Sequence, residues 1–205
     1  MDTRKKILDK ALEMFNERGI EYVGLRELAS ILSMRVSNIT YYFPTKDDLV
    51  YALSLQLTKS NAEVIVEREQ LTITAFLQML HQVFQNHLTF RCLLLSVVHL
   101  MKQNKHLSAA YINTQKVRNR AMHSNLQALQ RAGYLQPKDE TEMEFLVSGI
   151  SLISRFWISE AAISFNDLST EQQIRHYLAL ISNLLRPYST ARGLNEMDHF
   201  LDSVQ

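Results

Sequence analysis

A short run of polar and aromatic residues, Ser37 to Tyr42, carries side chains that suit contact with the base edges of double-stranded DNA. The amide of Asn38 matches the two bonding positions of adenine, and the methyl group of Thr40 can pack on a thymine methyl. Hydroxyl groups such as those of Tyr41 and Tyr42 reach phosphate oxygens. A helix that serves structure alone would carry charged residues at these outer positions. The run therefore predicts a helix that enters the major groove.

Two cations flank this run. Arg35 precedes it, and Lys46 follows it at the start of the next expected helix. A helix N-terminus offers unpaired N–H groups and the positive end of the dipole, to which a lysine adds a charge for a phosphate; a solvated lysine is the alternative interpretation. Residues 1–50 contain eight Lys/Arg and eight Asp/Glu, so this part is neutral. Because DNA affinity depends largely on phosphate neutralisation, the interpretation requires these charges to separate onto different faces.

Three helices are expected to position this run. The first carries an apolar stripe and ends at Gly19, and the second begins after Gly24 and runs over 25–32. The third covers about 36–42 and is stopped by the proline at position 44. The stripe of the first helix consists of Ile7, Leu8, Ala11, Leu12 and Phe15.

The third helix has an inner and an outer side. Ile39 and Phe43, four residues apart, are expected to point inward, and Tyr41 outward. Tyr42 leaves two interpretations open, a place in the small core or a place on the DNA face. Thr45 and Asp48 resemble a capping box for a fourth helix that extends to about residue 68.

The block from Gly19 to Leu49 resembles the DNA-binding domain of the tetracycline-repressor-like (TetR/AcrR) family of transcriptional regulators, above all in the segment TYYFPTKDDL at 40–49. The residues that match the family pattern are Arg26, Ala29, Tyr41, Tyr42, Phe43, Lys46 and Leu49. The sequence departs from the pattern at Gly24, Ser33, Arg35, Ser37 and Thr40, and several of these are base-reading positions, so the operator preference stays open.

This resemblance implies a homodimeric repressor that leaves a palindromic operator when a small-molecule effector binds. The DNA-binding residues that we expect are Arg35, Ser37, Asn38, Thr40, Tyr41, Tyr42 and Lys46. An activator is not distinguished from a repressor. The alternative is a non-transcriptional or architectural DNA-binding protein on the same scaffold.

The rest of the 205-residue chain reads as further helices, at about 71–88, 90–103, 106–132, 140–163 and 170–186, with a weakly patterned tail. Five glycines and three prolines are too few for a turn-rich β fold. We therefore expect an all-α protein. Its domains are a helix-turn-helix domain at 1–48 and a helical effector-binding and dimerisation domain at 49–205.

The interior of the helices over 71–132, closed by 145–163, is the expected effector site, because a few polar groups stand among apolar ones there. The residues that we expect to contact an effector are His81, His87, Arg91, His99, Tyr111 and Trp157. For each histidine, a plain structural role is the alternative. No metal site is expected, because no Cys/His set has ligand spacing, and no cofactor is expected.

The segments 145–163 and 174–185 are apolar over much of their circumference, which predicts a homodimer interface; burial in the core of one chain is the alternative. No catalytic motif of the phosphate-loop, nucleophile-elbow or zinc-protease type is present, so we do not expect an enzyme. The single cysteine, Cys92, is expected to be a buried small hydrophobe. No signal peptide and no membrane span are expected, and the expected location is the cytoplasm.

Overall fold

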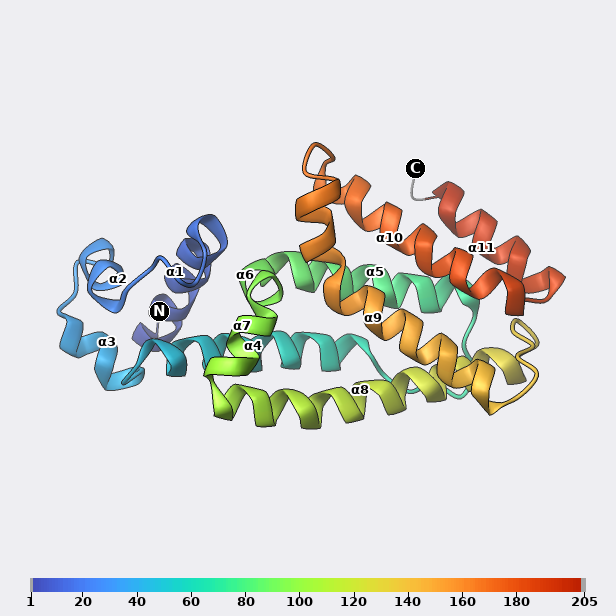
Figure 1. The fold of residues 1–205 in the computed structure, drawn as a ribbon, viewed down its shortest axis with the longest axis horizontal. Coiled ribbons are helices and arrows are strands. Elements are labelled where there is room, and N and C mark those ends of the chain that lie inside the picture. Colours follow the sequence, from blue (N-terminus) through green and yellow to red (C-terminus); the bar gives the residue numbers. More distant parts are fainter. Residues whose placement is uncertain (1, 204–205) are drawn as a thin grey trace. The chain divides into compact units, whose positions relative to one another are not determined.

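Residues 2–203 of the chain are described in a computed structural model, in which α-helices follow one another through short turns (Figure 1). Within residues 2–203 the only β pairing is an isolated bridge between Leu135 and Ser189. The predicted all-α class is therefore confirmed. In chain order the elements are α1 (Thr3–Arg18), α2 (Leu25–Ile31), α3 (Val36–Tyr42), α4 (Lys46–Val64), α5 (Ile73–Thr89), α6 (Arg91–Leu95), α7 (Val97–Gln103), α8 (Lys105–Arg131), α9 (Glu140–Ser164), α10 (Thr170–Leu185), the 3₁₀ turn η1 (Arg186–Tyr188) and α11 (Ala191–Ser203).

The chain divides into two compact units. Unit 1 comprises Met1–Ser60 and Thr89–Asn113, and unit 2 comprises Asn61–Leu88 and Thr114–Gln205. Helices α4 and α8 each contribute residues to both units. These units are defined by compactness, whereas the expected boundary between residues 48 and 49 concerns function, and that boundary stays a prediction.

Helix α1 forms where the apolar stripe predicts it. The carboxylate of Asp2 accepts a hydrogen bond of 3.1 Å from the backbone N–H of Arg4 and so caps the first turn. Four of the five stripe residues are buried, and Leu12 is half-buried. Gly19 ends the helix with a φ of +90°, a value that residues with a Cβ rarely adopt.

The capping box of α4 is also present as expected. The backbone N–H of Thr45 donates to the Asp48 carboxylate at 2.9 Å, and the Asp48 backbone N–H donates to the Thr45 hydroxyl at 3.2 Å. At its other end α4 stops at Val64, one turn before the predicted end at residue 68. Boundaries shift in this way because the last turn of a helix frays easily.

The predicted helix over 90–103 is in fact two helices, α6 and α7. The break falls at Ser96, whose φ of −96° and ψ of 9° lie outside the helical range. The buried position of Cys92 on α6 is confirmed, since 2% of it is exposed. Burial raises the pKa of its thiol to about 12, which removes the thiolate needed for redox chemistry.

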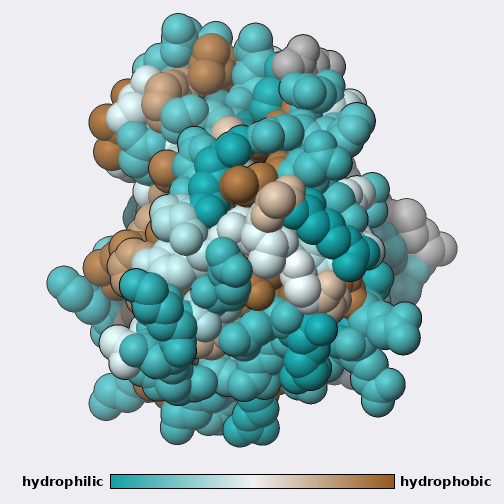
Figure 2. Space-filling view, turned by 90° about the vertical axis from the view of Figure 1, so that its right-hand side faces the viewer, coloured by the Kyte–Doolittle hydropathy of each residue, from teal (hydrophilic) through white to brown (hydrophobic). Residues whose placement is uncertain are grey.

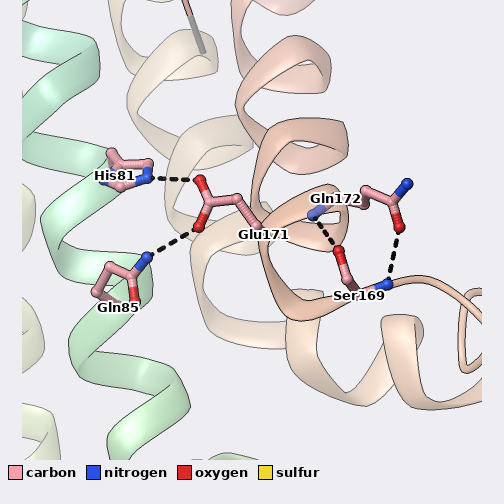
Figure 3. A network of polar contacts seen from close by, with 5 residues as sticks. All are labelled: His81, Gln85, Ser169, Glu171 and Gln172. Atoms are coloured by element: carbon pink, nitrogen blue, oxygen red, sulfur yellow. Dashed lines mark hydrogen bonds and ion pairs between the residues drawn. The ribbon is translucent and has the colours of Figure 1, made fainter. Parts of the chain in front are cut away.

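In unit 2, α9 and α10 lie against each other. A Cβ added to Gly149 of α9 would lie 2.7 Å from Cδ2 of Leu184 on α10, so glycine permits this close approach. Helix α10 begins with a capping box in which Ser169 and Gln172 exchange hydrogen bonds (Figure 3).

Apolar side chains remain exposed on this helix pair. On α9, 52% of Phe145, 59% of Leu152 and 81% of Ile163 are exposed, and on α10, 43% of Leu180. Figure 2 looks onto the end of unit 2 that carries α11 and the α8–α9 loop, where the surface is mainly hydrophilic with separate apolar patches. Exposed apolar positions on one helix pair are a feature of interfaces between chains.

Helix α11 occupies the tail that the sequence pattern left without an element. Met197 is fully buried, and a Cβ on Gly193 would lie 2.3 Å from the carbonyl oxygen of Tyr134. The carboxylate of Glu196 accepts from the backbone N–H of Thr74 at 3.3 Å, in the first turn of α5. These contacts join segments distant in sequence, which explains why the local pattern missed the helix.

Helix α9 corrects one further expectation. It is 25 residues long and reaches a mean hydropathy of 1.3 over an 18-residue window, so by length and composition it could cross a membrane. No membrane span was expected from the sequence, so by length and composition α9 departs from that expectation. Within unit 2, however, its residues Met143, Leu146, Ile150 and Trp157 are buried, and a core helix meets the same test.

Candidate nucleic-acid interface and effector region

A tight turn joins α2 to α3. The backbone N–H of Met34 donates to the carbonyl of Ala29 at 2.9 Å, and that of Ser33 donates to Ser30 at 3.0 Å. This pair of bonds is the Schellman arrangement, which places the residue at the turn in the left-handed region. Ser33 adopts it with a φ of +53°, although it carries a Cβ. The turn fixes the direction in which α3 leaves α2.

Helix α3 has the expected two sides. Ile39 is fully buried and 2% of Phe43 is exposed, so both anchor the helix in unit 1. Tyr41 is 81% exposed and points outward as expected. Tyr42, for which two interpretations were open, is 37% exposed and packs edge-on against Tyr41 with ring centroids 5.0 Å apart. Core filling therefore does not account for the whole of its side chain.

The predicted DNA-contacting residues on and before α3 are exposed or half-buried, and their contact with DNA stays a prediction. Arg35, Ser37 and Asn38 are exposed, and Thr40 is half-buried with its hydroxyl 3.4 Å from the carbonyl of Ser37. Arg35 occupies the N-cap of α3 without a side-chain capping bond. The exposed and half-buried positions of this short helix thus carry donors and acceptors, with a cation at its N-cap.

Cations in the helix-turn-helix region divide into two groups. Lys5, Lys10 and Arg18 pair with carboxylates, each at 2.6 Å. The hydrogen bond from Arg18 is the main reason that the pKa of Glu27 is lowered. Among the residues that the structure describes, the cations of this region without a carboxylate partner are Arg4, Lys6, Arg26, Arg35 and Lys46. Five carboxylates of the region, Asp2, Glu17, Glu21, Asp47 and Asp48, also lie outside these ion pairs, so the pairing does not by itself leave an excess of positive charge.

Two of these unpaired cations have positions set by other contacts. The ammonium of Lys46 donates to the backbone carbonyl of Glu21 at 3.2 Å, so it also ties α4 to the α1–α2 loop. The guanidinium of Arg4 lies 5.1 Å from the ring centroid of Phe43, a cation–π distance that holds it near the end of α3. Lys46 therefore has a structural contact beside any contact with a phosphate.

The six expected effector residues are divided between the two units. Arg91, His99 and Tyr111 belong to unit 1, whereas His81, His87 and Trp157 belong to unit 2. The guanidinium of Arg91 donates twice to the carbonyl of Asn16, at 3.1 and 2.7 Å, and so joins α6 to the end of α1. His99 is exposed and Tyr111 half-buried. Their role as effector contacts stays a prediction.

His87 and Trp157 form a buried polar cluster in unit 2. The indole N–H of Trp157 donates to Nδ1 of His87 at 3.1 Å, and Nε2 of His87 lies 3.3 Å from the amide of Asn61 on α4. Burial, with the nearby charge of Arg118, lowers the pKa of His87 to about 3. The imidazole is therefore neutral, and because Trp157 can only donate, its proton is on Nε2.

Sequence analysis did not identify Asn61 as a partner of this cluster. Asn61 is 2% exposed and also lies 3.1 Å from the amide of Asn86 on α5. Its Nδ2 faces Nε2 of His87, and its Oδ1 accepts from Nδ2 of Asn86. A ring proton on Nε2 requires an acceptor, so the two amides have to turn over together to present one. The available signal was weak, because an asparagine in a long helix is usually a surface residue.

His81 lies apart from this cluster. Its Nε2 is 3.2 Å from the carboxylate of Glu171 on α10, which also accepts from the amide of Gln85 at 3.2 Å (Figure 3). Both side chains reach from α5 toward the first turn of α10. The contact fastens these two helices on a partly exposed side of unit 2.

Comparison with known proteins places this architecture among bacterial regulators. Residues 7–53 match the family described as bacterial regulatory proteins, tetR family, and residues 58–197 match the family described as bacterial transcriptional repressor, TetR. A probable HTH-type transcriptional regulator, YttP, of Bacillus subtilis (strain 168) is 29% identical over 86 residues, which is 37% of this chain and 42% of that protein. The match thus spans less than half the length of this curated relative.

Solved structures share the fold. A TetR-family transcriptional regulator from Marinobacter aquaeolei VT8 superimposes with a TM-score of 0.91 at 20% identity, with all of both chains covered. A transcriptional regulator from Saccharomonospora viridis, solved in complex with choline, has a TM-score of 0.69 at 18% identity, covering 87% of this chain and 94% of that one. Because the two family models together match most of its length, the chain belongs to the TetR family of DNA-binding bacterial transcriptional regulators.

Proposed function

We propose that this regulator is a homodimeric repressor that binds a palindromic operator through α3 and leaves it when a small-molecule effector binds in unit 2. One observation carries the DNA-binding part of the proposal. The exposed side of α3 presents Ser37, Asn38 and Tyr41 beside the unpaired guanidinium of Arg35. Its inner side is anchored by buried apolar residues, so these groups are held rigidly for contact with the major groove.

A dimer is required by the size of the recognition helix. Seven residues of α3 read only a few base pairs, whereas two copies related by a two-fold axis read half-sites about 34–36 Å apart. The exposed apolar residues Phe145, Leu152 and Ile163 on α9 and Leu180 on α10 support an interface at the segments 145–163 and 174–185. The cytoplasm, where the chromosome lies, is the location that fits this role.

Release by an effector rests on helix α4. It begins next to α3 in sequence, and its last residues, from Asn61 onward, belong to unit 2. An effector that prefers one arrangement of unit 2 would shift this helix and change the separation of the two recognition helices. The choline-bound regulator from Saccharomonospora viridis is consistent with small-molecule binding on this scaffold.

Recovery of bound fragments from sheared genomic DNA tests the proposal. Sequencing is expected to return a few fragments that share a palindrome. Tyr41→Ala is expected to weaken binding to a synthetic copy of that palindrome without lowering the melting temperature, because Tyr41 is 81% exposed. Uniform recovery of DNA would instead favour an architectural role, and loss of folding in Tyr41→Ala would show that the residue serves structure.

A further inference from the structure

The buried amide of Asn125, on α8, has one polar atom that the chain does not satisfy. Asn125 is fully buried, and its carbonyl oxygen has no hydrogen-bond partner among the described residues. Its Nδ2 lies 3.7 Å from the thioether sulfur of Met79 on α5. A thioether accepts weakly and does not donate, so this contact fixes the nitrogen toward Met79 and leaves the oxygen as the free acceptor. Native proteins keep few such buried acceptors.

Residues at helical spacing place this acceptor on a seam between α5 and α8. Met79, Val83 and His87 follow one another at intervals of four along α5, and all three are buried. On α8, Asn125 contacts Met79, and the charge of Arg118, seven residues earlier, acts on His87. The two helices therefore run antiparallel along a strip whose ends, eight residues apart, are separated by about 12 Å.

His87 at the far end of this seam offers no free ring nitrogen to a ligand, and the cation whose charge acts on it is Arg118. Both ring nitrogens of His87 are engaged, Nδ1 by the indole of Trp157 and Nε2 by the amide of Asn61. In sequence, α5 carries Val83 between these ends and α8 carries Met122, and the two residues are 3% and 7% exposed. Methionine side chains adapt to an inserted group more readily than branched ones. The strip thus combines one free acceptor with pliable apolar walls.

We propose that this seam is the effector site, and that it selects a small, mainly apolar molecule with a single hydroxyl or N–H group that donates to the carbonyl oxygen of Asn125. The inference rests on the proposed effector response and names the ligand class. A donor gains the bond that the buried oxygen lacks, whereas a molecule with only an acceptor brings a second lone pair against it. Specificity therefore depends on the donor and affinity on the apolar body.

Two probes of equal heavy-atom number test this selection. 1-Octanol carries a hydroxyl donor, and 1-methoxyheptane carries an ether oxygen that only accepts. Binding to the full chain is measured by calorimetry and by the fluorescence of Trp157, the single tryptophan. We expect 1-octanol to bind at least tenfold more tightly than the ether. Equal affinities of the two probes, or the absence of binding by both, would overturn the inference with the wild-type chain alone.

A variant then identifies the group responsible. Asn125→Leu keeps the side-chain size and removes the amide, so it is expected to bind both probes equally and to raise the melting temperature by about 2–4 °C. Ser182→Ala is the matched control, because the Ser182 hydroxyl is also fully buried without a partner but belongs to α10. The control is expected to keep the preference for 1-octanol. A preference that persists in Asn125→Leu contradicts the assignment.

Operator binding separates this inference from the wider proposal. In the absence of probe, the wild-type chain and Asn125→Leu are both expected to bind the recovered palindrome with equal affinity. A chain that binds DNA but shows no preference between the probes defeats the ligand class alone. A chain that binds no specific fragment defeats the proposed function, whatever the probes do.

Discussion

The indole of Trp157 and the imidazole of His87 are joined by a hydrogen bond of 3.1 Å in the interior of unit 2. Trp157 is 1% exposed and His87 is 4% exposed, so neither group exchanges this bond for water. A proton on Nδ1 of His87 would put two donors face to face. Burial and the charge of Arg118 act in the same direction, and the pKa of His87 falls to about 3.

Protonation of this histidine is expected to couple stability to pH. Between the usual pKa of 6.5 and the folded value of about 3, the unfolded chain binds a proton at His87 that the folded chain does not. The free energy of unfolding therefore falls as the pH drops through this window, by about 2 kcal/mol from pH 8 to pH 5. Urea denaturation at a series of pH values measures it.

His87→Gln supplies the control, because glutamine can accept from Trp157 and donate to Asn61 while remaining neutral. The chain has seven histidines, so only the difference between wild type and variant isolates His87. The variant is expected to lose less stability on acidification. Parallel pH curves for the two proteins would show that His87 does not stay neutral in the folded chain.

Replacing Ser33 with glycine is expected to stabilise the protein. Ser33 holds a φ of +53° in the turn before α3, and a left-handed residue with a Cβ costs about 1 kcal/mol relative to glycine. Gly133 occupies the same position of an equivalent turn after α8, with a φ of +76° and open space around its Cβ direction. Gly133→Ser is therefore expected to destabilise by a similar amount. Thermal melts of both variants measure these two changes in stability. A loss of stability in Ser33→Gly would refute the prediction.

Removing the guanidinium of Arg35 is expected to weaken DNA binding without affecting the fold. Each phosphate contact that is lost makes the slope of log affinity against log salt shallower by about 0.9, so the loss of one contact per chain of the proposed dimer amounts to about 1.8. Lys10→Ala is the matched control, because Lys10 is already paired with Glu13 at 2.6 Å. Binding titrations from low to high salt measure both slopes. Equal slopes for Arg35→Ala and wild type would remove Arg35 from the interface.

An added methyl group at position 193 is expected to undock α11. In Gly193→Ala the Cβ would lie 2.3 Å from the carbonyl oxygen of Tyr134, so the backbone has to move, at about 1–3 kcal/mol. Gly24→Ala is the control, since its Cβ would have no heavy atom within 4 Å. Differential scanning calorimetry compares them. Equal melting temperatures would mean that α11 is not held against Tyr134.

A charge on the exposed side of α9 is expected to separate the proposed dimer. Leu152 is 59% exposed, so Leu152→Glu costs little within one chain but places a carboxylate in an apolar interface. Ile112→Glu is the control, because Ile112 on α8 is 53% exposed and lies outside the proposed interface segments. Light scattering after size exclusion reports the mass of each variant. A dimeric Leu152→Glu would place the interface elsewhere.

Local patterns predicted unit 1 well because its signals lie close together in sequence. Gly19 and the Thr45–Asp48 pair end or begin helices through bonds within a few residues, and both stand where expected. The outward position of Tyr41 and the inward position of Phe43 also follow from helical spacing alone. Sequence reasoning is reliable where the residues that determine a feature lie within about one helical turn of each other.

The effector region and α11 were harder to predict because their contacts span long separations. Asn61 meets His87, and Glu196 caps α5 at Thr74, across 26 and 122 positions. The type and position of a polar residue within a helix do not indicate which distant residue it contacts. The expected set consequently mixed Arg91, which binds the end of α1, with residues of the other unit.

The glycine at position 149 has a consequence for how fast the proposed dimer can form. Because Leu184 fills the space next to Gly149, α9 and α10 form a prebuilt surface before any partner arrives. A partner then meets ordered side chains, and little conformational entropy is lost on association. Pairing needs no folding step, so its rate follows the ordinary docking range of about 10⁵–10⁷ M⁻¹s⁻¹. Assembly of the proposed dimer would therefore be limited by how often two chains meet in the right orientation, not by folding of the interface.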